Sequence, residues 1–134
     1  MKDQKIAFFV DDDPSFLFAL SDVIQHHCFM IQTYCAANGY RAVDEIIKVR
    51  PDVVFLDFNL PRANGSQIIA ILKSIKEFRN VPFFFMTGYP REAVASFLEE
   101  IQFDGLIEKS DHFVEETLKV LDDLAGSRSG SQRN

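Results

Sequence analysis

Short apolar runs alternate along the chain with longer segments in which apolar residues recur every three or four positions. The short runs are rich in Phe, Val and Ile, which is typical of strands, and they cover residues 5–10, 29–36, 52–57, 81–87 and 103–109. The longer segments have helical periodicity and cover residues 14–27, 39–49, 65–78, 91–101 and 111–124. This strict alternation predicts an α/β fold, in which five helices cover both faces of a five-stranded parallel sheet.

The chain of 134 residues is long enough for a single core, and we expect one domain over residues 1–125. Residues 126–134 contain no large apolar side chain, so we expect a disordered tail there. Hydrophobic residues make up 47% of the sequence, and 14 of them are phenylalanines, which predicts an aromatic-rich core.

Charge and composition exclude several classes of protein. The net charge of −6 argues against a nucleic-acid-binding surface, which needs clustered Lys and Arg. No run approaches the roughly 18 apolar residues that span a bilayer, and the first apolar run is too short for a signal peptide. The two cysteines, Cys28 and Cys35, are interpreted as small buried hydrophobes, which fits a reducing compartment. We therefore expect a cytoplasmic protein without nucleic-acid or membrane partners.

Polar side chains follow four of the five predicted strands, at the point where each strand ends. Ligands of open α/β sheets bind outside the carboxyl ends of the strands, so we expect these side chains to form one site. They are Asp11, Asp12 and Asp13 after the first strand, Asp57 at the end of the third, Thr87 at the end of the fourth and Lys109 after the fifth.

The acidic members of this group predict a metal site. Carboxylates that lie close together either raise one another's pKa or recruit a cation. Mg²⁺ prefers hard oxygen ligands, which Asp11, Asp12 and Asp57 could supply together with the backbone carbonyl of Asn59. We therefore expect Mg²⁺ as the cofactor.

The remaining members suit phosphoryl transfer. The carboxylate of Asp57 would act as the nucleophile, and the ammonium group of Lys109 would neutralise phosphoryl oxygens. The hydroxyl of Thr87 would hold another oxygen. The predicted product is an acyl phosphate on Asp57, which explains why a buried strand ends in a carboxylate.

Asp13 has two interpretations. It stands directly before Pro14, which is typical of a helix N-cap followed by proline at the first helical position. Alternatively, the run FFVDDDPS fits the hydrophobic-DxDx[ST] pattern of haloacid-dehalogenase-type phosphatases, with Asp11 as nucleophile and Asp13 as acid/base. That hypothesis leaves Asp57 without a role, and the chain lacks room for a cap domain.

Four segments resemble, in order and spacing, the signatures of the response-regulator receiver domain of two-component signalling (CheY-like). The resemblance covers residues 5–124, and its signatures are FFVDDDPSF, DVVFLDFNLPRANG, VPFFFMTGYP and GLIEKS. It implies a flavodoxin-like fold with strand order 2-1-3-4-5. It also implies a phosphoprotein that takes its phosphoryl group from a sensor histidine kinase or a histidine phosphotransfer domain.

The resemblance assigns roles to individual residues. Asp57 matches the phosphoacceptor, Asp11 and Asp12 match the acidic metal pair, Thr87 matches the switch hydroxyl and Lys109 matches the family's lysine. A receiver is a signalling phosphoacceptor in a two-component or phosphorelay system, and not an enzyme with a separate substrate. A degenerate receiver used only for docking is a further alternative, although every residue of the site is present.

The chain departs from the family at two positions that concern readout. The family usually has an aromatic residue three positions before the lysine and a cis proline directly after it, where this chain has Leu106 and Ser110. A cis bond to a residue other than proline costs about 2.5–4 kcal/mol, so we predict a trans Lys109–Ser110 bond. The signal would then leave through Thr87 and the loop after it, with Tyr89 as the aromatic residue able to move.

Docking and assembly give the last expectations. If Phe16, Leu20, Val23 and Ile24 face inward, then Leu17 and Phe18 form an exposed apolar face for a helical partner. Output would pass through contacts with an unknown protein, unless the chain is a piece of a longer one.

The family's common dimer face uses a charged network on the last helix, often with arginine. The predicted last helix has no arginine, so we expect a monomer or a dimer of another kind.

Overall fold

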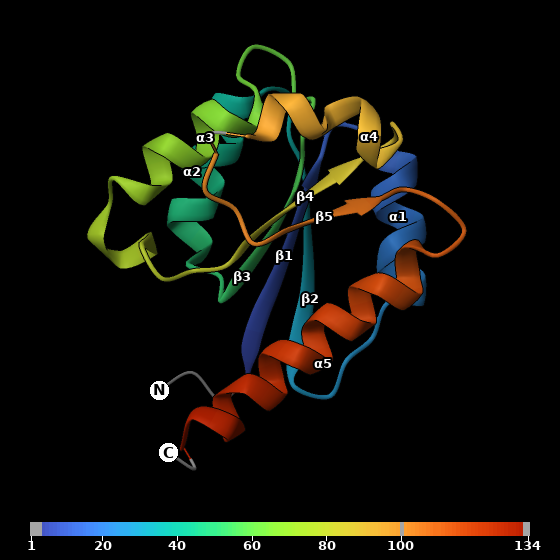
Figure 1. The fold of residues 1–134 in the computed structure, drawn as a ribbon, viewed down its shortest axis with the longest axis vertical. Coiled ribbons are helices and arrows are strands. Elements are labelled where there is room, and N and C mark those ends of the chain that lie inside the picture. Colours follow the sequence, from blue (N-terminus) through green and yellow to red (C-terminus); the bar gives the residue numbers. More distant parts are fainter. Residues whose placement is uncertain (1–3, 100, 133–134) are drawn as a thin grey trace.

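Parallel strands form one central sheet in a computed structural model that describes residues 4–99 and 101–132. The strand order is β2-β1-β3-β4-β5 (Figure 1). The strands are β1 (Lys5–Asp11), β2 (Phe29–Cys35), β3 (Val53–Asp57), β4 (Phe83–Thr87) and β5 (Gly105–Glu108). The helices are α1 (Pro14–Val23), α2 (Gly39–Val49), α3 (Gly65–Lys73), α4 (Arg91–Val94) and α5 (Phe113–Gln132), with 3₁₀ helices η1 (Lys76–Phe78) and η2 (Ala95–Leu98). The predicted α/β class and the strand order implied by the resemblance are both confirmed.

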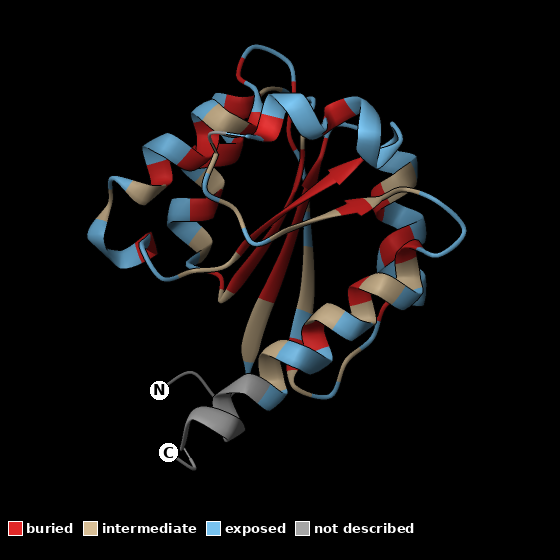
Figure 2. Cartoon of the chain, viewed as in Figure 1, coloured by how far each residue is buried: buried red, intermediate tan, exposed pale blue. Residues whose placement is uncertain are grey.

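The helices divide between the two faces of the sheet. Leu17 and Leu20 of α1 and Leu121 of α5 are buried on one face, and α2, α3 and α4 cover the other (Figure 1). The central strands β1, β3 and β4 carry long runs of buried residues (Figure 2). Phenylalanine rings stack across neighbouring strands: the Phe9 and Phe55 centroids are 4.4 Å apart. Because the sheet is buried on both faces, its central strands read as continuous apolar runs.

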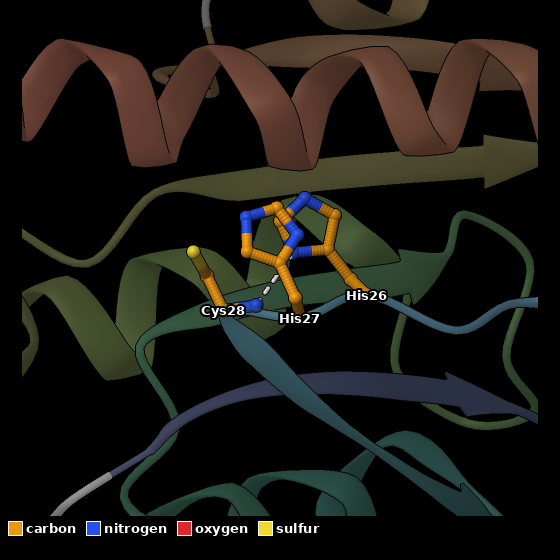
Figure 3. A group of neighbouring side chains, drawn as sticks. All are labelled: His26, His27 and Cys28. Carbon is orange, nitrogen blue, oxygen red and sulfur yellow. Dashed lines mark hydrogen bonds between the residues drawn. The ribbon is translucent and has the colours of Figure 1, made fainter.

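Helix α1 is shorter than predicted and ends at Val23, because Ile24 adopts an extended conformation. The loop that follows contains His26, which the periodicity had placed in the helix. The Nδ1 atom of His26 accepts a hydrogen bond from the backbone N–H of Cys28 at 3.0 Å (Figure 3). Its Nε2 atom must therefore carry the proton, and it lies 2.8 Å from Oδ1 of Asp122 on α5. Both ring nitrogens are thus engaged, and the side chain ties the loop to α5.

The cysteines only partly match the prediction. Cys28 is partly buried, whereas Cys35 is exposed, so the expectation of a buried residue is wrong for Cys35. The reason is that β2 is an edge strand in which only Phe29 is buried, and Cys35 is its last residue. Both cysteines are free thiols.

Two further helices end earlier than the periodicity predicts. Helix α3 stops at Lys73, and the segment that continues to residue 78 contains a turn and η1. The ammonium group of Lys73 donates to the carbonyl oxygens of Arg79 and Val81, at 3.0 and 2.8 Å, which fixes the chain on its way into β4. Helix α4 is a single turn, continued by η2 instead of a regular helix to residue 101.

Helix α5 is longer than predicted. It continues to Gln132 instead of ending at residue 124. The disordered tail expected from composition over residues 126–134 stays a prediction, and residues 133–134 lie outside the described residues. Extending an existing helix costs far less than starting one, and Thr117 and Leu121 anchor the helix upstream. The domain limit at residue 125 stays a prediction. No helix in the described ranges is long and apolar enough to cross a membrane.

Candidate functional site

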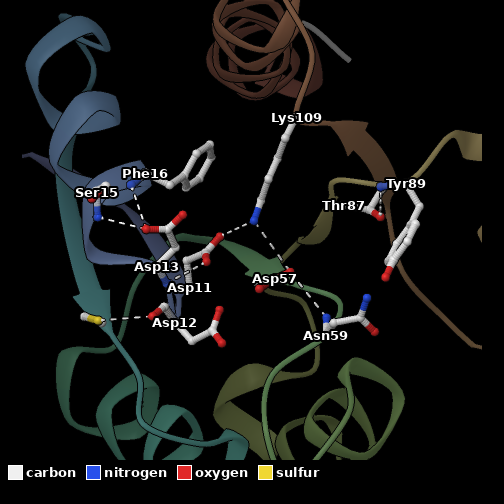
Figure 4. A network of polar contacts seen from close by, with 11 residues as sticks. Asp11, Asp12, Asp13, Ser15, Phe16, Asp57, Asn59, Thr87, Tyr89 and Lys109 are labelled. Carbon is white, nitrogen blue, oxygen red and sulfur yellow. Dashed lines mark hydrogen bonds and ion pairs between the residues drawn. The ribbon is translucent and has the colours of Figure 1, made fainter.

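Acidic side chains meet at the carboxyl edge of the sheet (Figure 4). Asp11 is the last residue of β1 and Asp57 the last residue of β3, and these two strands are neighbours. Asp12 follows directly after β1. One carboxylate oxygen from each of the three residues lies within 4.8 Å of the others. Asp11 is fully buried and Asp57 is only 7% exposed, whereas Asp12 faces solvent.

The ammonium group of Lys109 lies between the two buried carboxylates (Figure 4). Its Nζ atom is 2.6 Å from Oδ2 of Asp11 and 3.8 Å from Oδ1 of Asp57. The backbone N–H of Lys109 donates to the carbonyl oxygen of Thr87 at 2.7 Å, which holds the end of β5 against β4. Lys109 therefore reaches the site although Ser110 stands where the family has proline.

Burial gives Asp57 an unusual protonation equilibrium. Desolvation and the negative charge of Asp11 raise its pKa from 3.8 to about 6. The charge of Lys109 and a hydrogen bond from the backbone N–H of Asn59 oppose the shift without cancelling it. That N–H lies 3.3 Å from Oδ1 of Asp57. The site thus has more negative charge than Lys109 alone neutralises.

The donor set fits a divalent cation. Oδ1 of Asp11 accepts the backbone N–H of Asp13 at 3.0 Å. Oδ2 of Asp11 is buried and forms the ion pair with Nζ of Lys109 at 2.6 Å, which uses only part of its capacity as an acceptor. It therefore retains lone pairs for a metal ion. Three carboxylates, one of them exposed so that water can complete the shell, match the oxygen coordination that Mg²⁺ prefers. A role for the backbone carbonyl of Asn59 stays a prediction.

Thr87 lies at the edge of the site, and its hydroxyl is bonded to the loop after β4 instead of to the carboxylates. Its side chain is buried, and its Oγ1 accepts the backbone N–H of Tyr89 at 3.0 Å (Figure 4). The Tyr89 ring is largely exposed. The hydroxyl oxygen acts in this bond only as an acceptor, so its own O–H remains available as a donor to another oxygen.

Asp13 points to the helix and not to the metal site. Its Oδ1 accepts the backbone N–H groups of Ser15 and Phe16 at 3.0 and 3.3 Å, and Pro14 occupies the first turn. This is the N-cap that the sequence predicts. A carboxylate engaged in this way is poorly placed for the acid/base role that the phosphatase hypothesis requires.

The predicted exposure of the docking face is right for Phe18 and wrong for Leu17. Leu17 is only 4% exposed and packs in the core, whereas Phe18 is 77% exposed. The inward stripe of the helix is Leu17, Leu20 and Ile24, while Val23 faces solvent. The prediction is therefore right for Leu20 and Ile24 and wrong for Leu17 and Val23, because α1 has apolar residues on several sides and ends at Val23.

The start of α4 makes a contact with β5 that the sequence does not predict. The guanidinium group of Arg91 donates to the carbonyl oxygen of Leu106 at 2.9 Å, and its backbone N–H donates to the carboxylate of Glu108 at 3.0 Å. Arg91 thereby joins the start of α4 to β5. Leu106 is partly buried, and the Lys109–Ser110 bond is trans, since the described residues contain no cis peptide bond. No local sequence pattern predicts these contacts of Arg91, because they depend on how β5 lies beside α4.

Comparisons with known proteins agree with this geometry. The family model of the response regulator receiver domain matches residues 7–119. Sporulation initiation phosphotransferase F of Bacillus subtilis is 37% identical over 89 residues, which are 66% of this chain and 68% of that protein. Transcriptional regulatory protein BtsR of Salmonella typhi is 39% identical over 72 residues, which are 53% of this chain but only 28% of that protein. The chain belongs to the response-regulator receiver domain family.

Solved structures show the same fold. The receiver domain of sensor histidine kinase PA1611 from Pseudomonas aeruginosa has a TM-score of 0.76 at 17% identity, with 92% of this chain and 98% of that chain covered. That structure is described as holding a magnesium ion in its active site cleft. Chemotaxis response regulator CheY4 of Vibrio cholerae has a TM-score of 0.72 at 21% identity, with 87% and 97% covered.

The raised pKa of Asp57 predicts a pH-dependent effect on stability. A carboxyl group whose pKa is higher in the folded state favours folding at low pH, and this advantage is lost as pH rises from about 4 to about 6. Asp57→Asn removes the buried charge. Without metal at pH 7.5, the variant should therefore be more stable than the natural protein by on the order of 2–3 kcal/mol.

Urea unfolding of both proteins at pH 4 and pH 7.5 measures this difference. The difference in the free energy of unfolding between the two proteins should disappear at pH 4, where Asp57 is protonated. At pH 7.5 the difference should become smaller when Mg²⁺ is added, because the variant has lost a metal ligand and gains less stability from the ion. A gap of equal size at both pH values would mean that the substitution acts through packing and not through charge.

Proposed function

We propose that this receiver domain accepts a phosphoryl group on the carboxylate of Asp57 from the phosphohistidine of a sensor histidine kinase or a histidine phosphotransfer domain. The observation that carries the proposal is the placement of Asp57. Its carboxylate is nearly buried at the end of a central strand, among two more carboxylates and one ammonium group. Holding carboxylates this close together in a nearly buried site costs free energy of folding unless a bound cation balances their charge.

The residues of the site have separate roles in the transfer. An oxygen of Asp57 attacks the phosphorus atom, the bond from phosphorus to the histidine nitrogen breaks, and the nitrogen keeps its electron pair. The product is an acyl phosphate. Asp11, Asp12, Asp57 and the backbone carbonyl of Asn59 would hold Mg²⁺, which neutralises phosphoryl oxygens when bound. Lys109 needs only a short movement from its position 3.8 Å from Asp57 to pair with another phosphoryl oxygen.

The domain is proposed to catalyse only its own phosphorylation and dephosphorylation. The engagement of Asp13 as an N-cap supports this proposal over a phosphatase that uses Asp11 and Asp13. The complete set of Asp11, Asp12, Asp57 and Lys109 supports it over a receiver that only docks. We further propose that output passes through protein contacts, and that the domain is a monomer or uses a dimer face other than the family's common one.

Covalent labelling tests the proposed acceptor. Incubation with acetyl phosphate and Mg²⁺ should add one phosphoryl group to the intact protein, which mass spectrometry at low temperature detects. The added mass should be absent in Asp57→Asn, because the nucleophile is lost, and present in Asp13→Ala, which removes only the helix cap. The phosphatase hypothesis predicts the opposite dependence, with labelling retained in Asp57→Asn and lost in Asp13→Ala.

The exposed ring of Phe18 suggests where the phosphoryl donor docks. Phe18 lies on α1, which begins three residues after Asp11, and an exposed apolar side chain there would contact a helical partner. Phe18→Glu should leave labelling by acetyl phosphate intact and slow transfer from the cognate phosphohistidine protein by about tenfold, the effect of losing about 1.4 kcal/mol of binding.

The matched control is Ile47→Glu, which places the same charge on an exposed apolar position of α2. Transfer rates from the partner are compared at subsaturating concentration. Equal rates for Phe18→Glu and the natural protein would remove Phe18 from the docking surface.

The contacts of Thr87 support a readout through the loop after β4. Formation of the acyl phosphate would draw the hydroxyl of Thr87 away from the backbone N–H of Tyr89, which frees the loop that leads into α4. Leu106 has no hydroxyl to exchange between solvent and interior, so we propose Tyr89 as the moving aromatic residue and Leu106 as a minor contributor.

Amide chemical shifts with and without beryllofluoride, which mimics a phosphoryl group, measure this response. We expect the largest changes outside the acidic site at residues 87–95. Changes concentrated at Leu106 and α5, with residues 87–95 unaffected, would show that the signal leaves by the other route.

A further inference from the structure

The aromatic ring of Phe16 lies against the ammonium group of the site. The ring centroid is 4.5 Å from Nζ of Lys109 (Figure 4). The sequence suggests only a core residue here, because Phe16 follows the helical spacing of α1. The ring is only partly buried, and its distance to the ammonium group is typical of a cation–π contact.

Two contacts fix the position of this ring. The backbone N–H of Phe16 donates to the N-cap carboxylate of Asp13, which sets the first turn of α1. The ring packs edge-on against Phe113 at the start of α5, with 5.3 Å between the centroids. The ring is therefore held between two helices and forms a fixed wall beside Lys109.

This wall restricts a side chain that would otherwise be flexible. A lysine ammonium group sits on a stem with four rotatable bonds, and ordering such a stem costs entropy. Three contacts restrict the position of Nζ of Lys109: the ring of Phe16, the carboxylate of Asp11 at 2.6 Å and the carboxylate of Asp57 at 3.8 Å. The side chain of Lys109 is only 20% exposed, so solvent competes weakly for the ammonium group.

We infer that Phe16 is a positioning residue for phosphoryl transfer: its ring holds the ammonium group of Lys109 beside Asp57 before the phosphoryl group arrives. The inference rests on the proposed function, because it assumes that Lys109 pairs with the phosphoryl group. An ammonium group already held within reach of the reacting carboxylate avoids part of the ordering cost at the moment of transfer. The attraction comes from the face of the aromatic ring, which an aliphatic side chain of similar size lacks.

A matched pair of substitutions separates this attraction from simple packing. Phe16→Leu keeps an apolar side chain but loses the ring, and Phe16→Tyr keeps the ring. With acetyl phosphate and Mg²⁺, Phe16→Leu should be phosphorylated about twofold to fivefold more slowly than the natural protein, the range expected for a cation–π contact near the surface. Phe16→Tyr should stay close to the natural rate. Tyr40→Leu, which removes an exposed aromatic ring from α2, serves as the control.

The contact itself is measured independently of phosphorylation. Ring currents from Phe16 should shift the Cε protons of Lys109 upfield in the NMR spectrum of the natural protein and of Phe16→Tyr. The shift should disappear in Phe16→Leu. Its absence from the natural protein would overturn the inference whatever the rates are.

The outcomes distinguish the inference from the proposed function. If the natural protein is labelled and Phe16→Leu is labelled equally fast, Phe16 does not position Lys109, and the proposed function stands. Equal losses in Phe16→Leu and Phe16→Tyr, or an equal loss in Tyr40→Leu, also overturn the inference, because the attraction between ring and ammonium group then does not explain the effect. If the natural protein takes no phosphoryl group at all, the proposed function fails and the inference falls with it.

Discussion

The contact between Lys109 and the buried carboxylates of Asp11 and Asp57 is the interaction on which the site depends. Two carboxylates at the ends of adjacent buried strands repel each other and lose hydration. One ammonium group at 2.6 and 3.8 Å offsets part of this cost, but the pKa of Asp57 still rises to about 6. The folded protein therefore carries a local excess of negative charge, which a divalent cation bound among the carboxylates would relieve.

The fold supplies the geometry of that contact. In a parallel sheet all carboxyl ends lie on one edge, so β1, β3 and β5 bring Asp11, Asp57 and Lys109 together from positions far apart in the sequence. The buried apolar residues of the strands pack behind this edge and keep it rigid. Gly65 shows how closely the parts fit, because a Cβ atom there would lie 2.2 Å from the ring of Phe85. The loop between β3 and α3 can approach β4 because this residue has no side chain.

The loops around the site differ in how firmly they are held. The loop after β1 is fixed by the N-cap of Asp13, and the loop after β5 by the hydrogen bond from Lys109 to Thr87. The loop after β4 is held mainly through the hydroxyl of Thr87 and the contacts of Arg91 with β5. The loop after β4 leads into α4, which is a single turn and is the shortest α-helix in the described ranges.

The sequence by itself determined the class of fold, the position of the site at the strand ends and the N-cap at Asp13. Each of these depends on local patterns: apolar runs for the strands, a polar residue where each strand ends, and Asp before Pro at a helix start. The resemblance added the strand order, which periodicity alone does not give.

The tertiary structure decided what local patterns leave open. It buried Leu17, which the sequence predicts to be exposed, because the face of α1 that points inward depends on how the helix sits on the sheet. It ended α1 at Val23, where Ile24 turns into the core, and it exposed Cys35 at the sheet edge. It also placed Phe16 beside Lys109 and Arg91 beside Leu106. Each of these contacts joins segments that are distant in the sequence, and their distances are set by packing between elements.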